Sequence, residues 1–408
     1  MTNRKLKLVL GIALVAASAA AHAQTAYVRP QYAYPETPPI TGPANVQIAD
    51  TPFFVTPYVG AAFGHDDNLF LSHTSQKASD IYIVSPGFHI DARDPNKVLQ
   101  ASYQGQIGRY TSSSGDDYVD HAARAQFDMA LDRHNFIRLG YEYIRSHDPR
   151  GSTDRPIEGS PDKYRQSTPS FTYALGAPGA IGHVELYYSD LQRRYLNNRD
   201  FTVNGDRKMP EYGGAFYWRI MPRTYVMAEA RGTNVRYDLS GSPLSADERR
   251  YYAGVTWEAT AATTGTVKFG RLERDFRDPS QPDFSGSSWE AAISWAPRSY
   301  SKFDFYSARQ TNESTGLGSF ILTSVGGVTW THGWTTYITT ALDARYQKDD
   351  YQGFDRNDKI SSLGLKAGYK FRRWLTLGAE YTRTHRDSNI DTFDYDKNLY
   401  LITLTGTL

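Results

Sequence analysis

The segment Lys397-Asn-Leu-Tyr-Leu-Ile-Thr-Leu-Thr-Gly-Thr-Leu408 decides the fold of this chain. Successive side chains of a β-strand point to opposite faces, so residues two apart share a face. One face of the segment is apolar, from Tyr400 through Leu404 to Leu408, whereas the other carries Leu401 and three threonines. The segment is therefore predicted to be a strand with one apolar side and one hydroxyl-rich side.

The same segment is similar to the strand that closes bacterial outer-membrane β-barrels. In those barrels the final residue is usually Phe, whereas here it is Leu408. The similarity implies that the rest of the chain supplies the strands of a ring that this segment completes.

Alternation of apolar and polar residues recurs from Phe53 onward. The runs with an apolar side chain at every second position include 99–107, 123–131, 137–143, 184–188, 212–218, 226–230, 253–257, 289–295, 338–346 and 363–371. Many of these runs are about ten residues long, the length that a tilted strand needs to cross a bilayer. Strands of soluble proteins are usually about half as long. The pattern therefore predicts membrane-spanning strands.

The connections between these runs alternate in length. Short turns are predicted at 132–135, 176–179, 221–223, 261–264, 297–299, 331–333 and 372–373, and longer polar loops at 146–162, 197–208, 238–249, 275–285, 310–318, 347–359 and 386–397. Outer-membrane barrels have short periplasmic turns and long extracellular loops. The fold predicted for residues 52–408 is all-β: a transmembrane antiparallel up-and-down β-barrel of about 18 strands.

The amino-terminal residues have the three parts of a secretory signal peptide. Arg4, Lys5 and Lys7 form a charged region, residues 8–20 are apolar, and Ala21-His22-Ala23 is a cleavage sequence. Residues 1–23 are therefore predicted to be a signal peptide, because the apolar run is too short to span a bilayer as a helix. Residues 24–51 contain five prolines and are predicted to form an extended or disordered periplasmic arm.

Composition narrows the possible functions. The chain has no Cys, which excludes disulfides and thiolate metal sites. Its 45 basic and 44 acidic residues balance, and loss of the basic leader leaves a slightly acidic chain without the positive surface that nucleic acid requires. Motifs for zinc, serine or phosphate chemistry are missing, and no two His residues share metal-ligand spacing on one strand. We expect no enzyme activity, no cofactor and no metal site.

Two acidic regions could bind a ligand, but each has a simpler interpretation. Asp66-Asp67-Asn68 could contact a cation or a sugar at the extracellular mouth, and is favoured as a turn whose side chains bond to the backbone. Asp349-Asp350 and Asp355-Arg-Asn-Asp358 could gather Ca²⁺ at an outer loop, and are favoured as solvated loop charges.

The two faces of the predicted barrel meet different surroundings. The outer face must be apolar because it touches lipid, whereas the inner face is wet and tolerates charged residues. Aromatic residues near strand ends suit girdles at the membrane interfaces. The residues assigned to these girdles are Tyr110, Tyr143, Trp218, Trp257, Trp295, Trp330, Trp334 and Trp374.

A barrel of this size leaves an aqueous channel, so the inner face is the candidate site. A tyrosine that faces water can stack on a sugar while charged neighbours bond its hydroxyls. The candidates for sugar contact are Arg124, Asp128, Arg138, Glu142, Glu229, Arg231, Tyr187, Tyr217, Tyr306 and Tyr337. The alternative that these tyrosines only fill the lumen or pack on an inserted loop stays open. Acids and bases are similar in number, so no strong ion selectivity is expected.

The opening Tyr58-Val-Gly-Ala-Ala-Phe-Gly-His-Asp-Asp-Asn-Leu-Phe70, together with the leader, the proline-rich arm and the Tyr/Arg/Asp-rich strands, resembles the β-barrel porin-2 family. This family includes barrels encoded with exopolysaccharide biosynthesis clusters. The resemblance covers nearly the whole mature chain. It implies a barrel in the bacterial outer membrane that passes a secreted polysaccharide and works beside a periplasmic polysaccharide export protein and a co-polymerase.

Two other functions fit the same pattern. One is a general-diffusion or sugar-uptake porin, for which the segment Ser146 to Asp162 is the best candidate for a constriction loop. The other is a structural or adhesive barrel without transport, in which the proline-rich arm would plug the lumen.

Overall fold

The computed structural model describes residues 46–48, 50–151, 159–177, 179–260, 262–314 and 316–407. The predicted signal peptide and most of the predicted periplasmic arm lie outside these residues. The last residues of the arm form β1 (Val46–Gln47), which pairs antiparallel with β2. No helix in the described residues is long and apolar enough to span a membrane.

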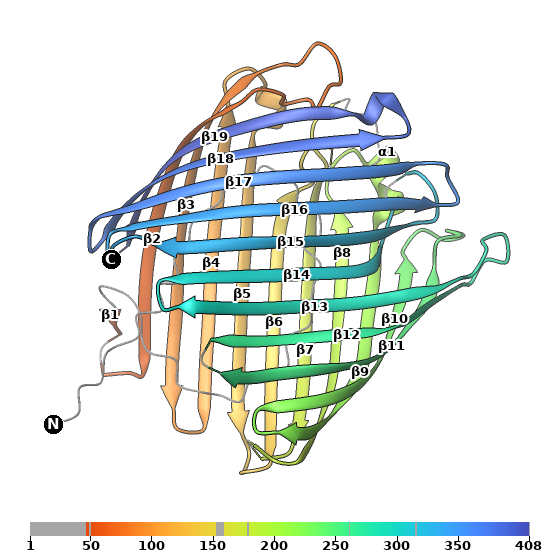
Figure 1. Cartoon of the computed structure of the whole chain (residues 1–408). Helices are drawn as coiled ribbons and strands as arrows, with labels where there is room; N and C mark the ends of the chain where they lie inside the picture. Colours follow the sequence, from red (N-terminus) through yellow and green to blue (C-terminus); the bar gives the residue numbers. More distant parts are fainter. Residues whose placement is uncertain are drawn as a thin grey trace.

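Eighteen long strands follow β1 and make one closed ring (Figure 1). They are β2 (Phe53–Asp66), β3 (Ser79–Asp94), β4 (Lys97–Tyr110), β5 (Tyr118–Ala130), β6 (Asn135–His147), β7 (Lys163–Leu175), β8 (Gly182–Tyr195), β9 (Arg207–Met221), β10 (Thr224–Tyr237), β11 (Ala246–Thr260), β12 (Thr263–Phe276), β13 (Phe284–Arg298), β14 (Ser301–Asn312), β15 (Phe320–Gly333), β16 (Ile338–Gln352), β17 (Asn357–Arg372), β18 (Leu375–Ser388) and β19 (Tyr395–Thr407). The predicted transmembrane up-and-down barrel of about 18 strands is confirmed.

Each strand pairs antiparallel with the next along the chain, and the ring closes between β19 and β2. The closing seam runs from Leu399 opposite Asp66 to Thr407 opposite Tyr58. A closed ring leaves no unpaired sheet edge, so backbone groups are satisfied without water inside a membrane. The strand β19 therefore completes the barrel, as its similarity to the closing strands of outer-membrane barrels implied.

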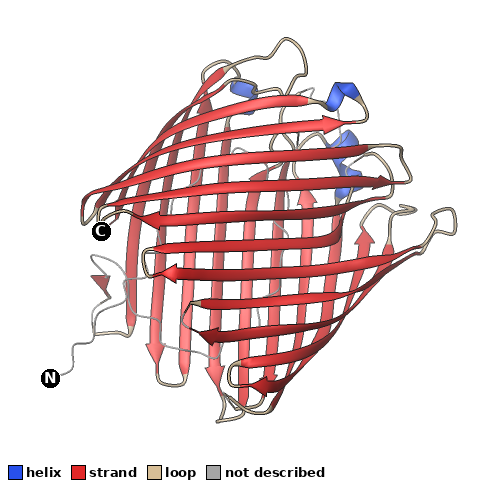
Figure 2. Ribbon diagram, viewed as in Figure 1, coloured by secondary structure: helices blue, strands red, loops and turns tan. Residues whose placement is uncertain are grey.

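The two ends of the barrel differ in their connections (Figure 2). At the periplasmic end the strands are joined by short turns, such as the one between Met221 and Thr224. At the extracellular end the connections are longer and include the short helix α1 (Arg199–Thr202) and the 3-10 turns η1 (Ser114–Asp116), η2 (Val203–Gly205) and η3 (Asp391–Phe393). The predicted asymmetry of turns and loops is therefore confirmed.

The strands extend farther into the extracellular mouth than the sequence predicted. Asp349 and Asp350 lie in β16, not in a loop, and Asp358 lies in β17. Asp358 and Arg356 are almost fully buried as an ion pair, with Nη2 and Oδ2 2.6 Å apart. The interpretation as solvated loop charges was therefore wrong for Asp349 and Asp358, which are buried on the inner wall: Asp358 is neutralised by Arg356, and Asp349 accepts a hydrogen bond of 2.6 Å from Thr323. Asp355 does lie exposed outside the strands.

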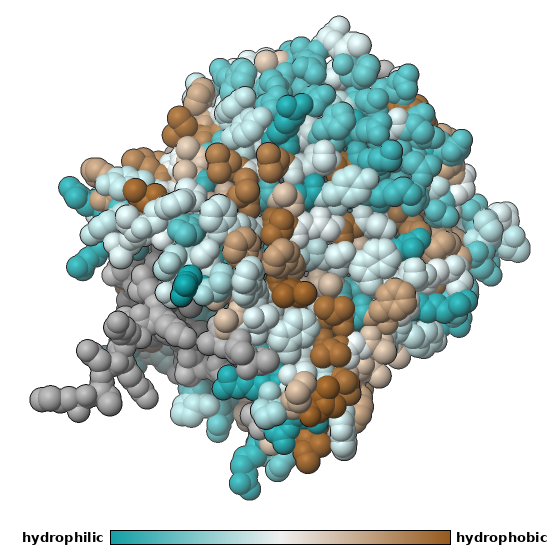
Figure 3. Space-filling model, in the orientation of Figure 1, coloured by the Kyte–Doolittle hydropathy of each residue, from teal (hydrophilic) through white to brown (hydrophobic). Residues whose placement is uncertain are grey.

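The outer face of the barrel is apolar. Large side chains that alternate with the inner-facing residues are exposed on it, among them Leu139 and Tyr141 of β6 and Phe216 of β9. Figure 3 shows hydrophobic residues as a band on the face in view, with hydrophilic residues gathered toward the loop end. This band is the surface that contacts lipid.

All the tryptophans assigned to a girdle lie at the periplasmic ends of strands or in the short turns there. Trp218, Trp295, Trp334 and Trp374 are exposed. Tyr110 departs from the prediction, because it belongs to the inner phase of β4 and packs 6.5 Å from the ring of Tyr118.

Candidate functional site: the inner wall of the barrel

A row of polar residues crosses the inner wall from β3 to β7. His89, Ser102, Arg124, Glu142 and Thr168 occupy successive strands and are direct register partners. Neighbouring strands are about 4.8 Å apart, so the row offers a polar group at each step around the wall. The side chain of Arg124 is 71% exposed, and its Nε lies 2.5 Å from Oε1 of Glu142. This part of the wall is open to a solute.

A second ion pair, Asp128 with Arg138, lies four residues closer to the periplasmic end of β5 and is more enclosed. Arg138 donates to Asp128 through Nε at 2.6 Å and through Nη2 at 3.2 Å. Gln126 also donates to this carboxylate, at 2.8 Å. A two-point guanidinium–carboxylate contact of this kind fixes both side chains. The four predicted residues of β5 and β6 are thus brought together as two cross-strand pairs.

Four charged side chains form a closed quartet on the opposite part of the ring. Lys268 of β12 lies 2.8 Å from Glu229 and 2.6 Å from Glu290. Arg231 lies 2.7 Å from Glu229 and 2.9 Å from Glu290. All four side chains are at most 3% exposed. Each cation contacts both acids, which offsets the cost of removing these charges from water.

Tyr187 belongs to this quartet and not to the open wall. Its hydroxyl donates to Glu229 at 2.6 Å, and the side chain is buried. Tyr252 lies against the two cations from the other side, with its ring centre 5.1 Å from Nζ of Lys268. The predicted residues Tyr187, Glu229 and Arg231 are therefore adjacent, in a packed cluster.

Tyr217 and Tyr306 occupy separate places on the inner wall. The ring of Tyr217 stacks on His183, with centres 4.3 Å apart and planes 10° apart, and is buried. Tyr306 of β14 is half-buried. Tyr337 is not on a strand: it precedes β16 in the periplasmic turn and is 61% exposed. The four predicted tyrosines therefore do not form one site.

Several inner-wall tyrosines lie on glycines of a neighbouring strand. A Cβ placed at Gly87 would come 2.3 Å from Tyr58, and one at Gly327 would come 2.7 Å from Tyr306. Only glycine lets a ring approach the backbone so closely. The half-buried Tyr58 and Tyr306 therefore lie flat on the wall and keep part of each ring accessible.

Sequence reasoning missed Tyr58 and His89, which make an aromatic pair beside the polar row. Their rings stack with centres 5.6 Å apart, and His89 begins the row. The signal that could have found them is Gly87, a glycine inside a strand facing a tyrosine. This glycine alone did not identify the pair, because the register between strands must be known before the tyrosine that faces Gly87 can be named.

Buried ion pairs also line the extracellular mouth. Arg274 is fully buried and makes a two-point contact with Glu313, at 2.8 and 3.0 Å. The hydroxyl of Tyr237 donates to the same carboxylate at 2.6 Å. Glu313 follows the end of β14, so the start of that loop is held inside the mouth.

The loop after β6, the sequence's candidate for a constriction loop, makes contacts on two sides of the mouth. Arg150 binds Asp116 of the β4–β5 connection through Nε at 2.5 Å and Nη2 at 3.1 Å. Farther along, Gly151 accepts a hydrogen bond of 2.5 Å from Arg386 of β18. Five strands, β19 and β2 to β5, separate β18 from β6 in the ring. The described part of this loop therefore crosses the inner side of the barrel.

The base of this loop contains a buried carboxylate. Burial raises the pKa of Asp148, the residue that follows β6. The hydroxyl of Tyr195 donates to it at 2.9 Å, and its backbone N–H donates to the carbonyl of Asp162 at 2.7 Å. Protonation of this carboxyl therefore favours the docked base of the loop.

The acidic segment Asp66-Asp67-Asn68 is a turn, as favoured from the sequence. The backbone N–H of Asn68 donates to Asp66 at 3.1 Å, and the carboxylate of Asp67 accepts from the backbone and side chain of Asn398, both at 2.7 Å. These bonds fasten the first loop to the closing strand. Within the described ranges, no group of three or more His, Asp or Glu side chains is placed to hold a metal ion.

The lipid-facing outer band, the closed ring and the polar inner wall define a porin-type barrel of the outer membrane. The family described as "Putative beta-barrel porin 2" matches residues 50–407, so the chain belongs to that family and lies in the bacterial outer membrane. Comparison with curated proteins finds no match.

Among solved structures the chain is similar to outer-membrane proteins at low sequence identity. The FrpB iron transporter from Neisseria meningitidis (F3-3 variant) has 10% identity and a TM-score of 0.43, over 81% of this chain and 62% of that one. OccAB2 from Acinetobacter baumannii has 11% identity and a TM-score of 0.46, over 87% and 97%. A bacterial polysaccharide outer membrane secretin has 10% identity and a TM-score of 0.34, over 86% and 97%. The chain thus spans about three fifths of the FrpB transporter's length.

Proposed function

We propose that this barrel is a conduit through which a secreted polysaccharide crosses the outer membrane. The observation that supports this proposal is the open polar row from His89 to Thr168, with Arg124 exposed within it. Hydroxyl, guanidinium and carboxylate groups at regular spacing suit a chain of hydroxyl-rich units. The stacked rings of Tyr58 and His89 next to the row suit the apolar face of a sugar.

Pairing of charges on the inner wall favours a solute of low charge over an ion. Several acids of this wall have basic partners, as in Arg124 with Glu142 and Lys366 with Glu380. Paired charges give little net field along a pore, so they select ions weakly. The proposal needs no catalytic step by this chain. It includes a periplasmic polysaccharide export protein as the partner that would deliver the polymer, an assignment that follows from the family resemblance.

A general-diffusion or sugar-uptake porin is the second candidate. The observation in its favour is the loop after β6, which Arg150 and Arg386 hold across the mouth. A loop in this position narrows the lumen and would restrict a polymer more than a small solute.

The test is conductance of the purified barrel in planar bilayers, titrated with fragments of the host's own exopolysaccharide. The proposal predicts open steps that the fragments block, and a block weakened about tenfold by Arg124→Ala or Tyr58→Ala, the loss expected for one or two contacts. Tyr337→Ala is the matched control, because this residue lies outside the lumen.

Each other outcome supports a different function. Steps that are indifferent to the polysaccharide, with free passage of small sugars, would establish the diffusion porin. Failure to conduct at all would leave the structural barrel.

A further inference from the structure

A row of arginines faces outward near the extracellular ends of β6, β7 and β8. Arg145 is the direct register partner of Arg165, which in turn is the partner of Arg194. All three are exposed. They belong to the lipid-facing phase, because Arg145 shares its face with Leu139 and Arg165 shares its face with Phe171. Like charges directly opposite each other on a sheet lower stability, so this row requires an explanation.

Acidic side chains of the protein neutralise little of the charge of the Arg145–Arg165–Arg194 row. Arg194 has one distant partner, with its Nε 3.9 Å from Asp206. Within the described residues, neither Arg145 nor Arg165 forms an ion pair. Elsewhere on the outer face basic residues are paired, as in Arg249 with Asp275 at 2.5 Å. The row therefore offers unused charge to a ligand.

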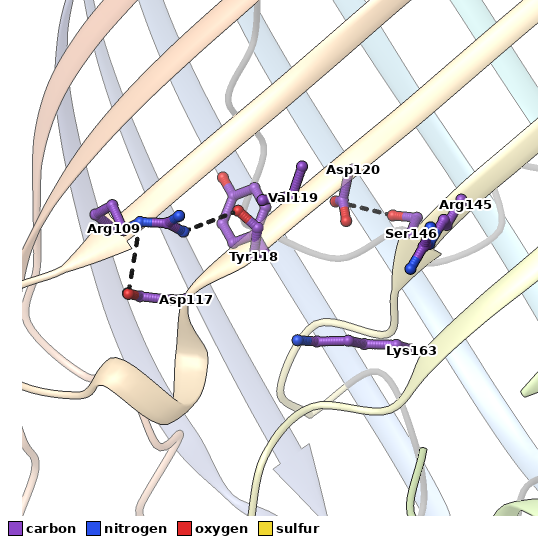
Figure 4. A pocket seen from close by; sticks show the side chains of 8 residues that line it. All are labelled: Arg109, Asp117, Tyr118, Val119, Asp120, Arg145, Ser146 and Lys163. Carbon is purple, nitrogen blue, oxygen red and sulfur yellow. Dashed lines mark hydrogen bonds and ion pairs between the residues drawn. The ribbon is translucent and has the colours of Figure 1, made fainter. Parts of the chain in front are cut away.

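A pocket of about 280 Å³ opens beside the row, where β5 and β6 part (Figure 4). The last register pair of these strands is His121 with Arg145. Beyond it β6 still pairs with β7 as far as His147. The pocket lies in this gap and is lined by Arg109, Asp117, Tyr118, Val119, Asp120, Arg145, Ser146 and Lys163.

The charge of the pocket is positive at its rim. Arg109, Arg145 and Lys163 contribute three cations. Of the two acids, Asp120 is engaged by Ser146 at 2.9 Å and by His147 at 3.0 Å. Asp117 accepts the backbone N–H of Tyr110 at 2.9 Å and lies 3.7 Å from Arg109. Both acids are thus held by other groups, which leaves Arg145 and Lys163 for an anion.

The height of these cations on the barrel indicates the kind of anion. Arg145 follows Tyr143 on the outer face of β6, and Arg109 follows Ile107 on that of β4, so the cations lie just beyond the apolar band. A lipid's charged headgroup lies at this level, with its acyl chains along the band below. Guanidinium groups bind phosphate at two points, which makes phosphate the best fit to a row of arginines.

From this geometry we propose that the pocket between β5 and β6 and the adjoining Arg145–Arg165–Arg194 row bind the phosphates of a glycolipid in the outer leaflet. The site is distinct from the polar row between His89 and Thr168 and does not depend on what the barrel transports.

Native mass spectrometry of the full chain, purified in detergent, tests this assignment. The probes are lipid A with two phosphates and the same lipid A with its phosphates removed. The chain should hold the phosphorylated lipid at least about tenfold more tightly, the effect expected for charge-assisted bonds. This comparison uses the native sequence, so it does not depend on the folding of any variant. Equal binding of the two lipids would overturn the proposal.

Variants locate the site. The pair R145Q/R165Q should lose the preference for phosphorylated lipid, and so should R109Q/K163Q. R249Q is the matched control, because this arginine is also outward and exposed but is paired with Asp275. An equal loss in R249Q would show that any surface charge suffices and would contradict a defined site.

Competition with soluble anions distinguishes a lipid ligand from other molecules that carry the same anionic groups. Inorganic phosphate and an acidic exopolysaccharide are added as competitors. The proposal predicts that neither displaces the lipid at concentrations comparable to it. Displacement by the acidic polysaccharide at such concentrations would assign the row to a soluble polymer and reject the lipid.

Discussion

Lys268 is the side chain on which the buried quartet depends most. Its ammonium is shared by Glu229 and Glu290, at 2.8 and 2.6 Å, and the side chain is 2% exposed. Lys268→Met would leave two buried acids with one cation, Arg231. We expect the free energy of unfolding in urea to fall by about 3–5 kcal/mol, the usual cost of an uncompensated buried charge.

The matched control for this substitution is Lys302→Met. Lys302 also pairs with an acid, at 2.9 Å from Asp304, but both side chains are exposed. Exposed pairs contribute only about 0–1 kcal/mol. A loss below about 1 kcal/mol for Lys268→Met, similar to that of the control, would mean that the quartet is no more than a set of surface pairs.

Asp148 gives the loop after β6 a dependence on pH. Because burial raises its pKa, the folded chain binds this proton more tightly than the unfolded chain. The docked loop base is therefore most stable below the ordinary pKa of an aspartate, and it loses stability as the pH rises through the raised value. Hydrogen exchange of the Asp148 amide, corrected for its intrinsic pH dependence, should quicken over this range, and Asp148→Asn should abolish the change.

Asp132 provides a comparison of opposite sign. The backbone N–H of His134, followed by the side chain of Asn135, lowers its pKa in the periplasmic turn. A lowered pKa stabilises the turn above the ordinary value, and this stability is lost as the pH falls through the lowered value. Exchange in this turn should therefore quicken toward acid. The same direction of change at both sites would contradict the assignment of the Asp148 effect to burial.

At the level of single residues, the sequence predicted the face of each side chain better than its partners. Period-two alternation assigned Arg124, Glu142, Glu229 and Arg231 to the inner wall, where they lie. It could not separate the exposed Arg124 from the buried Arg231, because exposure depends on side chains of other strands, such as Tyr252 of β11 and Glu290 of β13 around Arg231. In the same way, alternation assigned both Tyr187 and Tyr306 to the inner wall and could not show that Tyr187 is buried whereas Tyr306 remains partly accessible.

Among the elements, the loop after β6 is the one whose described residues contact both β18 and the β4–β5 connection. Arg150 holds it by two bonds to Asp116 and by contact with the ring of Phe70, 4.6 Å away. We expect Arg150→Ala to release the loop and to increase both the unit conductance and the current noise in planar bilayers. Arg249→Ala removes an exposed arginine from the outer face and should change neither. Identical traces for the two variants would show that the loop does not limit the pore.

The strand ends were the elements least predictable from the sequence. Runs such as 347–359 are rich in charge and were therefore predicted to be loops. In the structure Asp349 accepts a bond of 2.6 Å from Thr323 on the neighbouring strand, and Asp358 is paired with Arg356. Charges that neutralise one another allow a strand to continue. Arg356 is only two residues from Asp358 on the same segment, but the other partners of these acids, Thr323 of β15 and Ser388 of β18, lie on neighbouring strands. A pattern along one segment therefore cannot reveal that the two acids are buried.

For the whole molecule, closure of the ring predicts that β2 and β19 lie side by side. Because the native chain has no cysteine, two introduced cysteines can test this contact. Ala62 of β2 is the register partner of Thr403 of β19. The double variant A62C/T403C should form a disulfide under mild oxidation and change the mobility of the unfolded chain on a gel. A62C/T405C, in which the second cysteine lies two residues from the register position, is the control. Equal cross-linking of both variants would contradict the register of the seam.

The tryptophan girdle has a consequence for how the barrel stands in its membrane. All seven tryptophans lie from Trp218 onward, and those at the periplasmic rim centre on β11 to β18. The outward arginines lie at the other rim, on β6 to β8, almost diametrically across the ring. One side of the cylinder is therefore anchored in the inner leaflet and the opposite side is drawn toward the outer surface. With these two anchors on opposite sides and at opposite ends of the barrel, the tilt of the barrel axis relative to the bilayer would be fixed.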